Sequence, residues 1–257
     1  MGYSDEKDSS AAIEPVEGER SGQIEARLDL GRERRTGIPE IILAEVKTDD
    51  QVVAIVRSFL ERRGHALVSR LRAEMSERLR REFDECEVDL RVLARAAAIH
   101  ARGYQRPHTG GQIGILTAGT SDVAIAEEAR LVAEEMGVEV TTLYDVGVAG
   151  IHRLFEPLDA LFRRDVAALV VCAGMDGALP SVVAGLAPVP VIGVPTSVGY
   201  GAGGKGRAAL LSMLQTCVPG LTVVNINNGV GAGATAALIA NRAARARSQG
   251  ERLAKSV

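Results

Sequence analysis

The second half of the chain carries two side chains that could do covalent or acid–base chemistry, a carboxylate and a thiol. Asp176 is the only carboxylate between Asp165 and Glu251, and it lies in a glycine-flanked turn after an apolar run. A carboxylate in such a turn can accept a proton from a substrate or ligate a magnesium ion. Cys217 follows a predicted helix. Because the C-terminal end of a helix disfavours a thiolate, this position alone indicates an inert thiol.

Polar side chains also follow the first two apolar runs of this half. Thr120, Ser121 and Asp122 come after the first run, where they can cap a helix or face a ligand with a carboxylate and backbone N–H groups. His152 and Arg153 come after the second run. They could engage a phosphate group, or His152 could be an ordinary helix residue. The residue types leave both interpretations open at each place.

A glycine-rich segment follows the fourth apolar run. Gly201, Gly203 and Gly206 have the G-x-G-x-x-G spacing of dinucleotide-binding loops. The acidic residue expected about 20 positions later to hold a ribose is missing, which disfavours a standard NAD dehydrogenase. Gly199, Gly204 and Lys205 have the spacing of a P-loop, but Gly206 replaces the Ser or Thr that would hold magnesium, which disfavours an ATPase. We expect a flexible loop whose backbone amides could cradle a phosphate group.

Amide side chains and a glycine follow the last apolar run, at Asn227, Asn228 and Gly229. At the start of a helix, these residue types suit a polar ligand or a phosphate group. Cys172 ends an apolar run and is interpreted as a core residue. The chain has three widely spaced cysteines, which indicate neither a disulfide framework nor a metal knuckle.

Most of these groups follow predicted strands, which identifies the elements that must position them. The apolar, β-rich runs lie at 113–118, 138–144, 167–173, 190–194 and 221–226. The helical stretches lie at 122–136, 150–163, 178–186, 206–216 and 231–245. This alternation predicts a parallel sheet covered on both faces, a flavodoxin-like three-layer α/β domain. Such sheets bind ligands beyond the carboxyl ends of their strands.

The first hundred residues differ in composition, with more than half of the charged side chains but few of the 28 glycines. We expect a smaller α/β region here, with a helix over 49–64 and short strands at 66–70 and 87–93, separated by a charged amphipathic helix. The turn-rich segment GYQRPHTGG leads into the second half. The predicted parts are a disordered 1–25, an N-terminal α/β region 26–105, a parallel-sheet domain 106–247 and a tail 248–257.

Charge and hydropathy exclude several classes of protein. The formal net charge is −3 and the pI is near 5.9, which argues against binding nucleic acid through bulk charge. No apolar run reaches the roughly 18 residues that span a bilayer, so we expect no membrane segment. The polar, acidic N-terminus lacks the basic and apolar regions of a signal peptide, and we therefore expect a cytoplasmic protein.

Taken in order, these segments resemble a known family over most of the chain. The sequence resembles the pyridinium-3,5-biscarboxylic acid mononucleotide synthases, the LarB proteins. The segments that carry the resemblance are DLGRERRTGIPEIILAEVKT, GILTAGTSDVAIAEEA, YDVGVAGIHRL, CAGMDGALPSVVAGL, PVIGVPTSVGYGAGGKG and NINNGVGAG. The second half is similar, more distantly, to PurE-type aminoimidazole ribonucleotide carboxylases and mutases, at Ser121-Asp122, at His152-Arg153 and in the Ala-Gly-Met…Leu-Pro segment.

The resemblance implies the first step in the synthesis of the nickel-pincer nucleotide cofactor of lactate racemase. The substrate would be nicotinic acid adenine dinucleotide, which is carboxylated with CO₂ and cleaved to release AMP. Cys217 would attack the pyridinium ring covalently. The family usually has a glutamate where this chain has Asp176, to which we assign proton removal or a magnesium ion.

The implied chemistry suits a thiolate, because the adduct is an electron-rich dihydropyridine whose enamine carbon can attack CO₂. The glycine loops and Lys205 would hold the diphosphate, and Mg²⁺ would assist its hydrolysis with no organic cofactor. The relatives also imply a homo-oligomer, a tetramer or, in preference, an octamer. The small residues of the predicted helix over 231–247 suit close packing between helices.

Two other functions stay open at this point. One is a PurE-type carboxylase or mutase, against which the segment AGIHRL lacks the fuller Ser-Ala-His-Arg-Thr-Pro pattern and Cys217 would have no task. The other is a non-catalytic nucleotide-binding protein on the same fold, which would have no reason to form a covalent adduct on Cys217.

Overall fold

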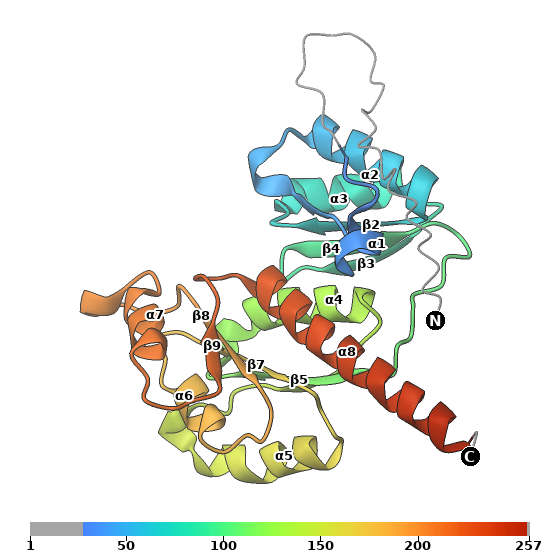
Figure 1. Cartoon of the computed structure of the whole chain (residues 1–257). Helices are drawn as coiled ribbons and strands as arrows, with labels where there is room; N and C mark the ends of the chain where they lie inside the picture. Colours follow the sequence, from blue (N-terminus) through green and yellow to red (C-terminus); the bar gives the residue numbers. More distant parts are fainter. Residues whose placement is uncertain (1–27, 256–257) are drawn as a thin grey trace.

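The computed structural model describes residues 28–255, which form two α/β domains joined by a linker over 101–111 (Figure 1). The segment expected to be disordered, 1–25, lies outside the described residues, as do the side chains at 251–253 and 255. Within the described part, no helix is long and apolar enough to cross a membrane.

The N-terminal domain is a four-stranded mixed sheet with its helices. Its elements are α1 (Arg32–Thr36), β1 (Ile41–Leu43), the 3₁₀ turn η1 (Ala44–Val46), α2 (Asp49–Arg63), β2 (His65–Ser69), α3 (Ala73–Glu82), β3 (Glu87–Arg91) and β4 (Ala96–His100). The strand order is β1-β2-β4-β3, with β1 and β2 parallel and the other pairs antiparallel. The predicted helices and strands are present, whereas the sequence pattern does not reveal α1, β1 or β4.

The C-terminal domain is a five-stranded, all-parallel sheet. Its elements are β5 (Gln112–Thr117), η2 (Thr120–Asp122), α4 (Val123–Glu135), β6 (Glu139–Leu143), η3 (Val148–Gly150), α5 (His152–Arg163), β7 (Leu169–Ala173), α6 (Leu179–Ala184), β8 (Val191–Pro195), η4 (Gly201–Gly203), α7 (Arg207–Leu214), β9 (Leu221–Val223) and α8 (Gly229–Lys255). The order β6-β5-β7-β8-β9 is the flavodoxin-like order. The predicted fold class is therefore confirmed.

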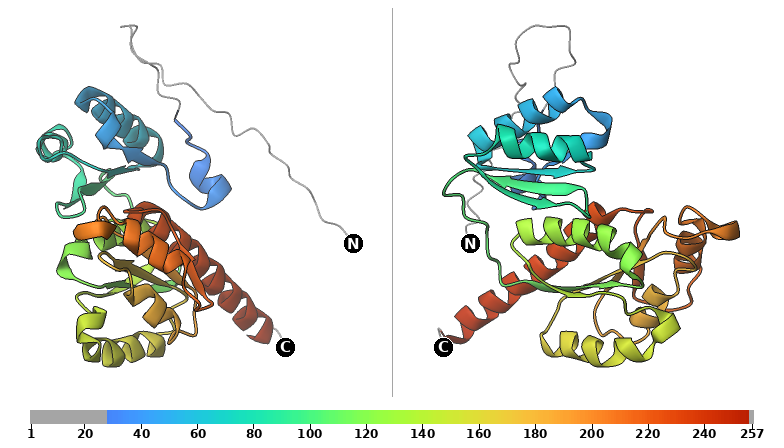
Figure 2. Two further views of the ribbon diagram at one scale, coloured as in Figure 1. Left: turned by 90° about the vertical axis from the view of Figure 1, so that its left-hand side faces the viewer. Right: turned by 180° about the vertical axis from the view of Figure 1, so that it is seen from behind.

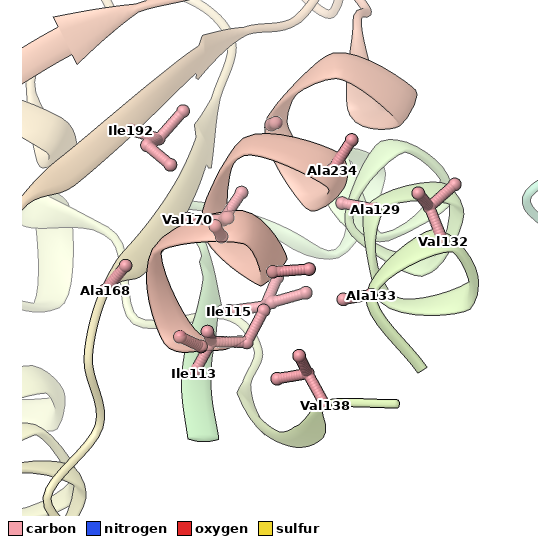
Figure 3. Packing of buried hydrophobic residues seen from close by; sticks show 14 of the residues in the cluster. Ile113, Ile115, Ala129, Val132, Ala133, Val138, Ala168, Val170, Ile192 and Ala234 are labelled. Carbon is pink, nitrogen blue, oxygen red and sulfur yellow. The ribbon is translucent and has the colours of Figure 1, made fainter. Parts of the chain in front are cut away.

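Helices cover both faces of this parallel sheet. Helices α4 and α8 pack on one face and α5, α6 and α7 on the other. Figure 3 shows Ile115 and Val170 of the sheet against Ala234 of α8 and Ala129 of α4. The two helices approach closely at Gly233, where a Cβ atom would lie 2.2 Å from the carbonyl oxygen of Ala129, so only glycine fits there.

Helix α2 of the N-terminal domain shows how local sequence determines where a helix begins and ends. It begins with a capping box, in which Thr48 accepts a hydrogen bond from the Gln51 amide and the Gln51 side chain accepts one from the Thr48 amide. It ends at Gly64, whose φ of 76° suits a glycine C-cap. Val52 and Val56 on its inner face are fully buried against the sheet. Together with α3, this helix covers one face of the N-terminal sheet.

The other face of the N-terminal sheet packs on the C-terminal domain, above α4 (Figures 1 and 2). Ala96 and Ala98 of β4 lie in one buried cluster with Leu67 of β2 and Leu131 of α4. Alanine has a low strand propensity, which is why the sequence pattern does not indicate β4. Its small side chains let the helix lie close against the sheet.

Two elements differ in length from the prediction. Strand β9 ends at Val223, three residues before the predicted end. Helix α8 does not end at 245 but continues to Lys255, through most of the segment expected to be a tail, and it extends beyond the domain in Figures 1 and 2. The residues from 242 to 255 are mostly Ala, Arg, Gln, Glu and Lys, which favour helix, and they include no proline.

Candidate active site

The loops that follow the five parallel strands meet at one edge of the sheet, the carboxyl edge. They are 118–122 after β5, 144–150 after β6, 174–178 after β7, 196–206 after β8 and 224–228 after β9. Every predicted site residue except Cys217 lies in these loops or at the first residue or two of the helices that follow them. Their hydrogen bonds decide which side chains are free to meet a ligand.

Asp122 is a buried anchor of this edge. Its Oδ1 atom accepts a hydrogen bond from the Thr196 hydroxyl at 2.6 Å, and its Oδ2 atom accepts one from the Gly119 amide at 3.0 Å. Burial raises the pKa of the Asp122 carboxyl above its ordinary value, and these hydrogen bonds oppose the shift. Asp122 therefore ties the loop after β5 to the loop after β8, while Thr120 and Ser121 beside it are exposed.

Asn227 ties together the loops after β8 and β9. The Ser197 amide donates to Asn227 Oδ1 at 2.8 Å, and Asn227 Nδ2 donates to Ser197 Oγ at 2.8 Å. Asn227 has a φ of 56°, a left-handed conformation that Asn adopts more readily than most residues. Asn228 accepts from the Gly231 amide at 2.8 Å and so caps α8, which begins at Gly229.

Asp176 projects from the turn after β7 and is exposed. The turn is tight because the Met175 amide donates to the Val198 carbonyl oxygen at 2.8 Å, with Met175 at a φ of 54°. A Cβ atom on Gly174 would lie 2.5 Å from that same oxygen, so glycine is required there. The backbone thus holds an exposed carboxylate at the carboxyl edge, close to the loop after β8.

The glycine-rich segment forms an exposed loop between β8 and α7. Gly201 and Gly203 bound the short turn η4, and Gly204 and Lys205 follow it, with Lys205 exposed at a φ of 60°. Helix α7 begins only after Gly206. The loop therefore presents a lysine and backbone amides beside the carboxyl edge.

His152 and Arg153 begin α5 at the same edge. Arg153 Nη1 donates to Asp145 Oδ2 at 2.6 Å, across two exposed side chains. Asp145, in the loop after β6, has a φ of 59°. Asp145 is not among the site residues that the sequence predicts, although an aspartate directly after a strand is a recognisable signal. The Arg153 guanidinium therefore has a carboxylate partner before any ligand binds.

Cys217 does not lie with these groups. It comes between α7 and β9, and the residues that follow it lead into the amino end of β9, where the Val191 amide of β8 donates to the Gly220 carbonyl oxygen. Val218, the next residue, lies close to Gly185 at the C-terminal end of α6. This end of α6 also lies at the amino ends of the strands. Cys217 is exposed there, and the length of β8, roughly 15 Å, separates it from the carboxyl edge. A single copy of the chain does not bring Cys217 and Asp176 together.

A buried contact links the N-terminal domain to the carboxyl edge. Ser69 Oγ donates to Glu128 Oε1 at 2.6 Å, and Arg70 Nε lies 3.5 Å from the same oxygen. Arg70 Nη2 also donates to the Asn227 carbonyl oxygen at 2.6 Å. Burial raises the pKa of the Glu128 carboxyl, with Ser69 and Arg70 opposing the shift. Neither Glu128 nor Arg70 stands out in the sequence, because both look like ordinary surface charges.

The described residues include no group of three His, Cys, Asp or Glu side chains that could hold a metal ion. A magnesium ion at Asp176 would therefore need ligands from a substrate, water or a second copy of the chain. The magnesium assignment stays a prediction.

Comparisons with known proteins agree with the architecture. Residues 112–255 match the AIR carboxylase family, and residues 21–101 match the LarB/PurE-like N-terminal domain. An uncharacterized protein of Methanocaldococcus jannaschii is 44% identical over 223 residues, which cover 85% of this chain and 86% of that protein.

Two mutases match a shorter stretch. The N5-carboxyaminoimidazole ribonucleotide mutase of Methanocaldococcus jannaschii is 36% identical over 127 residues, 49% of this chain and 74% of that protein. The mutase of the same name from Thermotoga maritima is 30% identical over 135 residues, 50% of this chain and 74% of that protein. Together with the loops at the carboxyl edge, these matches show that the chain belongs to the AIR carboxylase family, with a LarB/PurE-like N-terminal domain.

Proposed function

We propose that this protein carboxylates nicotinic acid adenine dinucleotide with CO₂ and cleaves its phosphoanhydride, to give pyridinium-3,5-biscarboxylic acid mononucleotide and AMP. This is the first step of nickel-pincer nucleotide synthesis for lactate racemase. The observation that carries the proposal is the presence, in one chain, of a carboxylase-family domain at 112–255 and a LarB/PurE-like domain at 21–101. The mutase relatives match only about half of the chain.

The carboxylation balances without an oxidant or reductant. The Cys217 thiolate adds to the pyridinium carbon beside the ring nitrogen, and the ring becomes a neutral dihydropyridine. The enamine carbon then forms a C–C bond to CO₂. A base, to which we assign Asp176, takes the proton from that carbon, and the thiolate leaves with its electron pair to restore the aromatic ring. Lys205 and the glycine loop beside it would hold the diphosphate while water cleaves it.

This chemistry requires a second copy of the chain, because Cys217 and Asp176 lie at opposite edges of one sheet. A thiol at the amino edge of one copy would have to face the carboxyl edge of another. Leu211 and Leu214 of α7, just before Cys217 in the chain, are 65% and 63% exposed and give this region apolar surface for such a contact. The proposal therefore includes a homo-oligomer, a tetramer or octamer, whose sites form between copies.

The direct test is turnover. The full chain is incubated with the dinucleotide, magnesium and ¹⁴C-labelled bicarbonate, and AMP and labelled mononucleotide are measured. We expect both products in equal amounts. Release of AMP without label in the mononucleotide would contradict the carboxylation.

A mixing experiment tests the shared site. Cys217→Ser and Asp176→Asn variants, each inactive alone, are combined under conditions that exchange subunits. Random assortment leaves about a quarter of the sites with both native residues, so we expect up to about a quarter of wild-type activity. If mixing restores nothing although mass spectrometry detects mixed oligomers, the two residues do not act in one site.

The mutase match favours a second candidate, an N5-carboxyaminoimidazole ribonucleotide mutase. Consumption of that ribonucleotide, with no reaction of the dinucleotide, would establish it. A non-catalytic nucleotide-binding protein would turn over neither compound, and mass spectrometry would find no dinucleotide adduct on Cys217.

A further inference from the structure

A cleft of about 450 Å³ lies between the N-terminal domain and the first two turns of α8. Ile38, Pro39 and Ile41 line it from the N-terminal domain, and Val230 and Ala234 line it from α8. Small-molecule sites in proteins occupy roughly 300–1,000 Å³ and are mostly apolar with a few polar groups. The cleft has the size and the apolar walls of such a site.

The polar groups of the cleft are mostly cationic or neutral. Arg32 forms an ion pair with Glu40 at 3.1 Å, but its side chain is 45% exposed and a guanidinium has five N–H donors, so part of it can meet a ligand. Glu128 lies at the cleft, where the Arg70 guanidinium compensates its charge and the Ser69 hydroxyl donates a hydrogen bond to it. Thr235 adds an exposed side chain on α8. This arrangement favours a ligand with a flat apolar part and an anionic part.

The cleft adjoins the carboxyl edge of the parallel sheet. Asn228 belongs to the turn after β9 and also lines the cleft, and its neighbour Asn227 holds the loop after β8. Arg70 lines the cleft and donates to the Asn227 carbonyl oxygen. A ligand that lies across the carboxyl edge can therefore continue into the cleft.

We propose that the cleft between the domains binds the adenylate half of the dinucleotide, while the pyridinium half lies at the carboxyl edge. This inference rests on the proposed function. The purine lies between the apolar walls and the adenylate phosphate lies toward Arg32, so Lys205 and the glycine loop hold the diphosphate chiefly by its other phosphate. The mutase relatives are named for a single ribonucleotide and match about half of this chain. The N-terminal domain thus supplies one wall of a second nucleotide subsite.

The test measures binding of AMP, without turnover, to the full chain by isothermal titration calorimetry. In the Thr235→Phe variant a ring is added at the cleft, and in Arg32→Met a cation is removed. We expect each to weaken AMP binding by about tenfold or more. Ala246→Phe, on an exposed position farther along α8, and Arg57→Met, which removes another exposed ion pair of the same domain, are the matched controls. Both should bind AMP like the wild type.

Nicotinic acid mononucleotide is the second probe, because it carries the pyridinium half alone. Its binding should be unchanged in Thr235→Phe. AMP binding that is unaffected by Thr235→Phe and Arg32→Met, or no saturable AMP binding to the wild type, would overturn the assignment of the cleft. Either result is independent of turnover, so it would not contradict the proposed reaction, which the turnover assay tests separately.

A nucleotide effector would bind the cleft through the same chemistry as the adenylate half of the substrate. The KM for the dinucleotide distinguishes the two sources. We expect Thr235→Phe to raise this KM by about tenfold with little change in kcat. Loss of AMP binding with an unchanged KM would overturn the substrate assignment.

Discussion

The two domains use their sheets in opposite ways. The C-terminal sheet is parallel, its faces are covered by helices, and its carboxyl edge carries loops with exposed or strained residues such as Asp176 and Lys205. The N-terminal sheet is mixed and packs against α4 through β2 and β4 on one of its faces. The loops that follow parallel strands bring polar side chains together at one edge of the sheet. The mixed sheet instead provides a face that packs on the other domain.

Charged contacts surround the docked face. Arg91 of β3 pairs with Glu134 of α4 and lies 3.5 Å from Glu127. His100 Nε2 lies 2.9 Å from Glu135, and Arg106 of the linker lies 2.7 Å from the same carboxylate. These contacts join the domains but stay away from the carboxyl edge. In the proposed function, the C-terminal domain carries the reacting groups and the N-terminal domain forms one wall of the adenylate subsite.

The largest expected effect concerns Cys217. Cys217→Ser should lose product formation almost completely, because a hydroxyl ionises far less readily than a thiol. Folding should be retained, since the side chain is exposed. Cys86→Ser should keep most activity, and so should Cys172→Ser, although Cys172 is fully buried and its loss will lower stability. Product formation by the three variants under identical conditions decides this. More than about a tenth of wild-type activity in Cys217→Ser, or less than roughly 1.4 kcal/mol of lost transition-state stabilisation, would exclude covalent catalysis.

Asp176→Asn tests whether the exposed carboxylate of the carboxyl edge acts on the substrate. We expect carboxylation to fall by about a hundredfold, the usual effect of removing a general base, while the dinucleotide still binds. Asp165→Asn is the matched control, because Asp165 is also exposed but lies before β7, at the amino edge. Turnover and calorimetric binding are measured for both variants. Near-normal turnover in Asp176→Asn would exclude an essential role.

Arg70→Met breaks the contact by which the N-terminal domain reaches the carboxyl edge. Removing the guanidinium leaves the Glu128 carboxylate buried without its cation, and we expect the free energy of unfolding to fall by about 3 kcal/mol. Arg72→Met is the control, since its ion pair with Asp49 is more exposed and should contribute less than about 1 kcal/mol. Chemical denaturation of both variants measures the difference. An equal fall in the free energy of unfolding of both variants would mean that the buried contact stabilises the protein no more than the exposed ion pair does.

The smallest effect is a pH dependence carried by Asp122. Its folded-state pKa is raised, chiefly by burial, so the folded protein binds more protons than the unfolded chain at pH values above the ordinary 3.8. This carboxyl therefore lowers stability as the pH rises from 3.8 through the folded-state pKa. Asp122→Asn removes the titration, and the stability of the wild type relative to this variant should decline with pH in that window. Denaturation at several pH values checks the sign, and a rise instead of a decline would contradict the buried, raised pKa.

The sequence predicts the C-terminal fold well, because apolar strands buried on both faces alternate with helices and leave a clear pattern. It predicts the N-terminal region less well, since the run of alanines in β4 has no strand signal and becomes a strand only through packing on α4. The location of Asp176 at the carboxyl edge follows directly from its place after a predicted strand. The task given to Cys217 came from the family resemblance. The same topological rule, applied to a residue that precedes a strand, puts Cys217 at the opposite edge.

Buried polar contacts between distant segments escape such reasoning. Glu128 lies on a helix rich in glutamate, and only the structure distinguishes it from the half-buried Glu127 and Glu134 of the same helix. Arg70 has a φ of 60°, a left-handed conformation that its local sequence does not predict. Both depend on how two domains meet, which a pattern within one segment does not encode.

Helix α4 is shared by two hydrophobic cores. Leu131 packs into the N-terminal sheet, while Ala129 and Val132 pack into the C-terminal core. The N-terminal domain therefore cannot unfold alone without exposing one side of a helix that the other domain needs. We expect one cooperative thermal transition for both domains, and the slowest amide hydrogen exchange of the chain in α4.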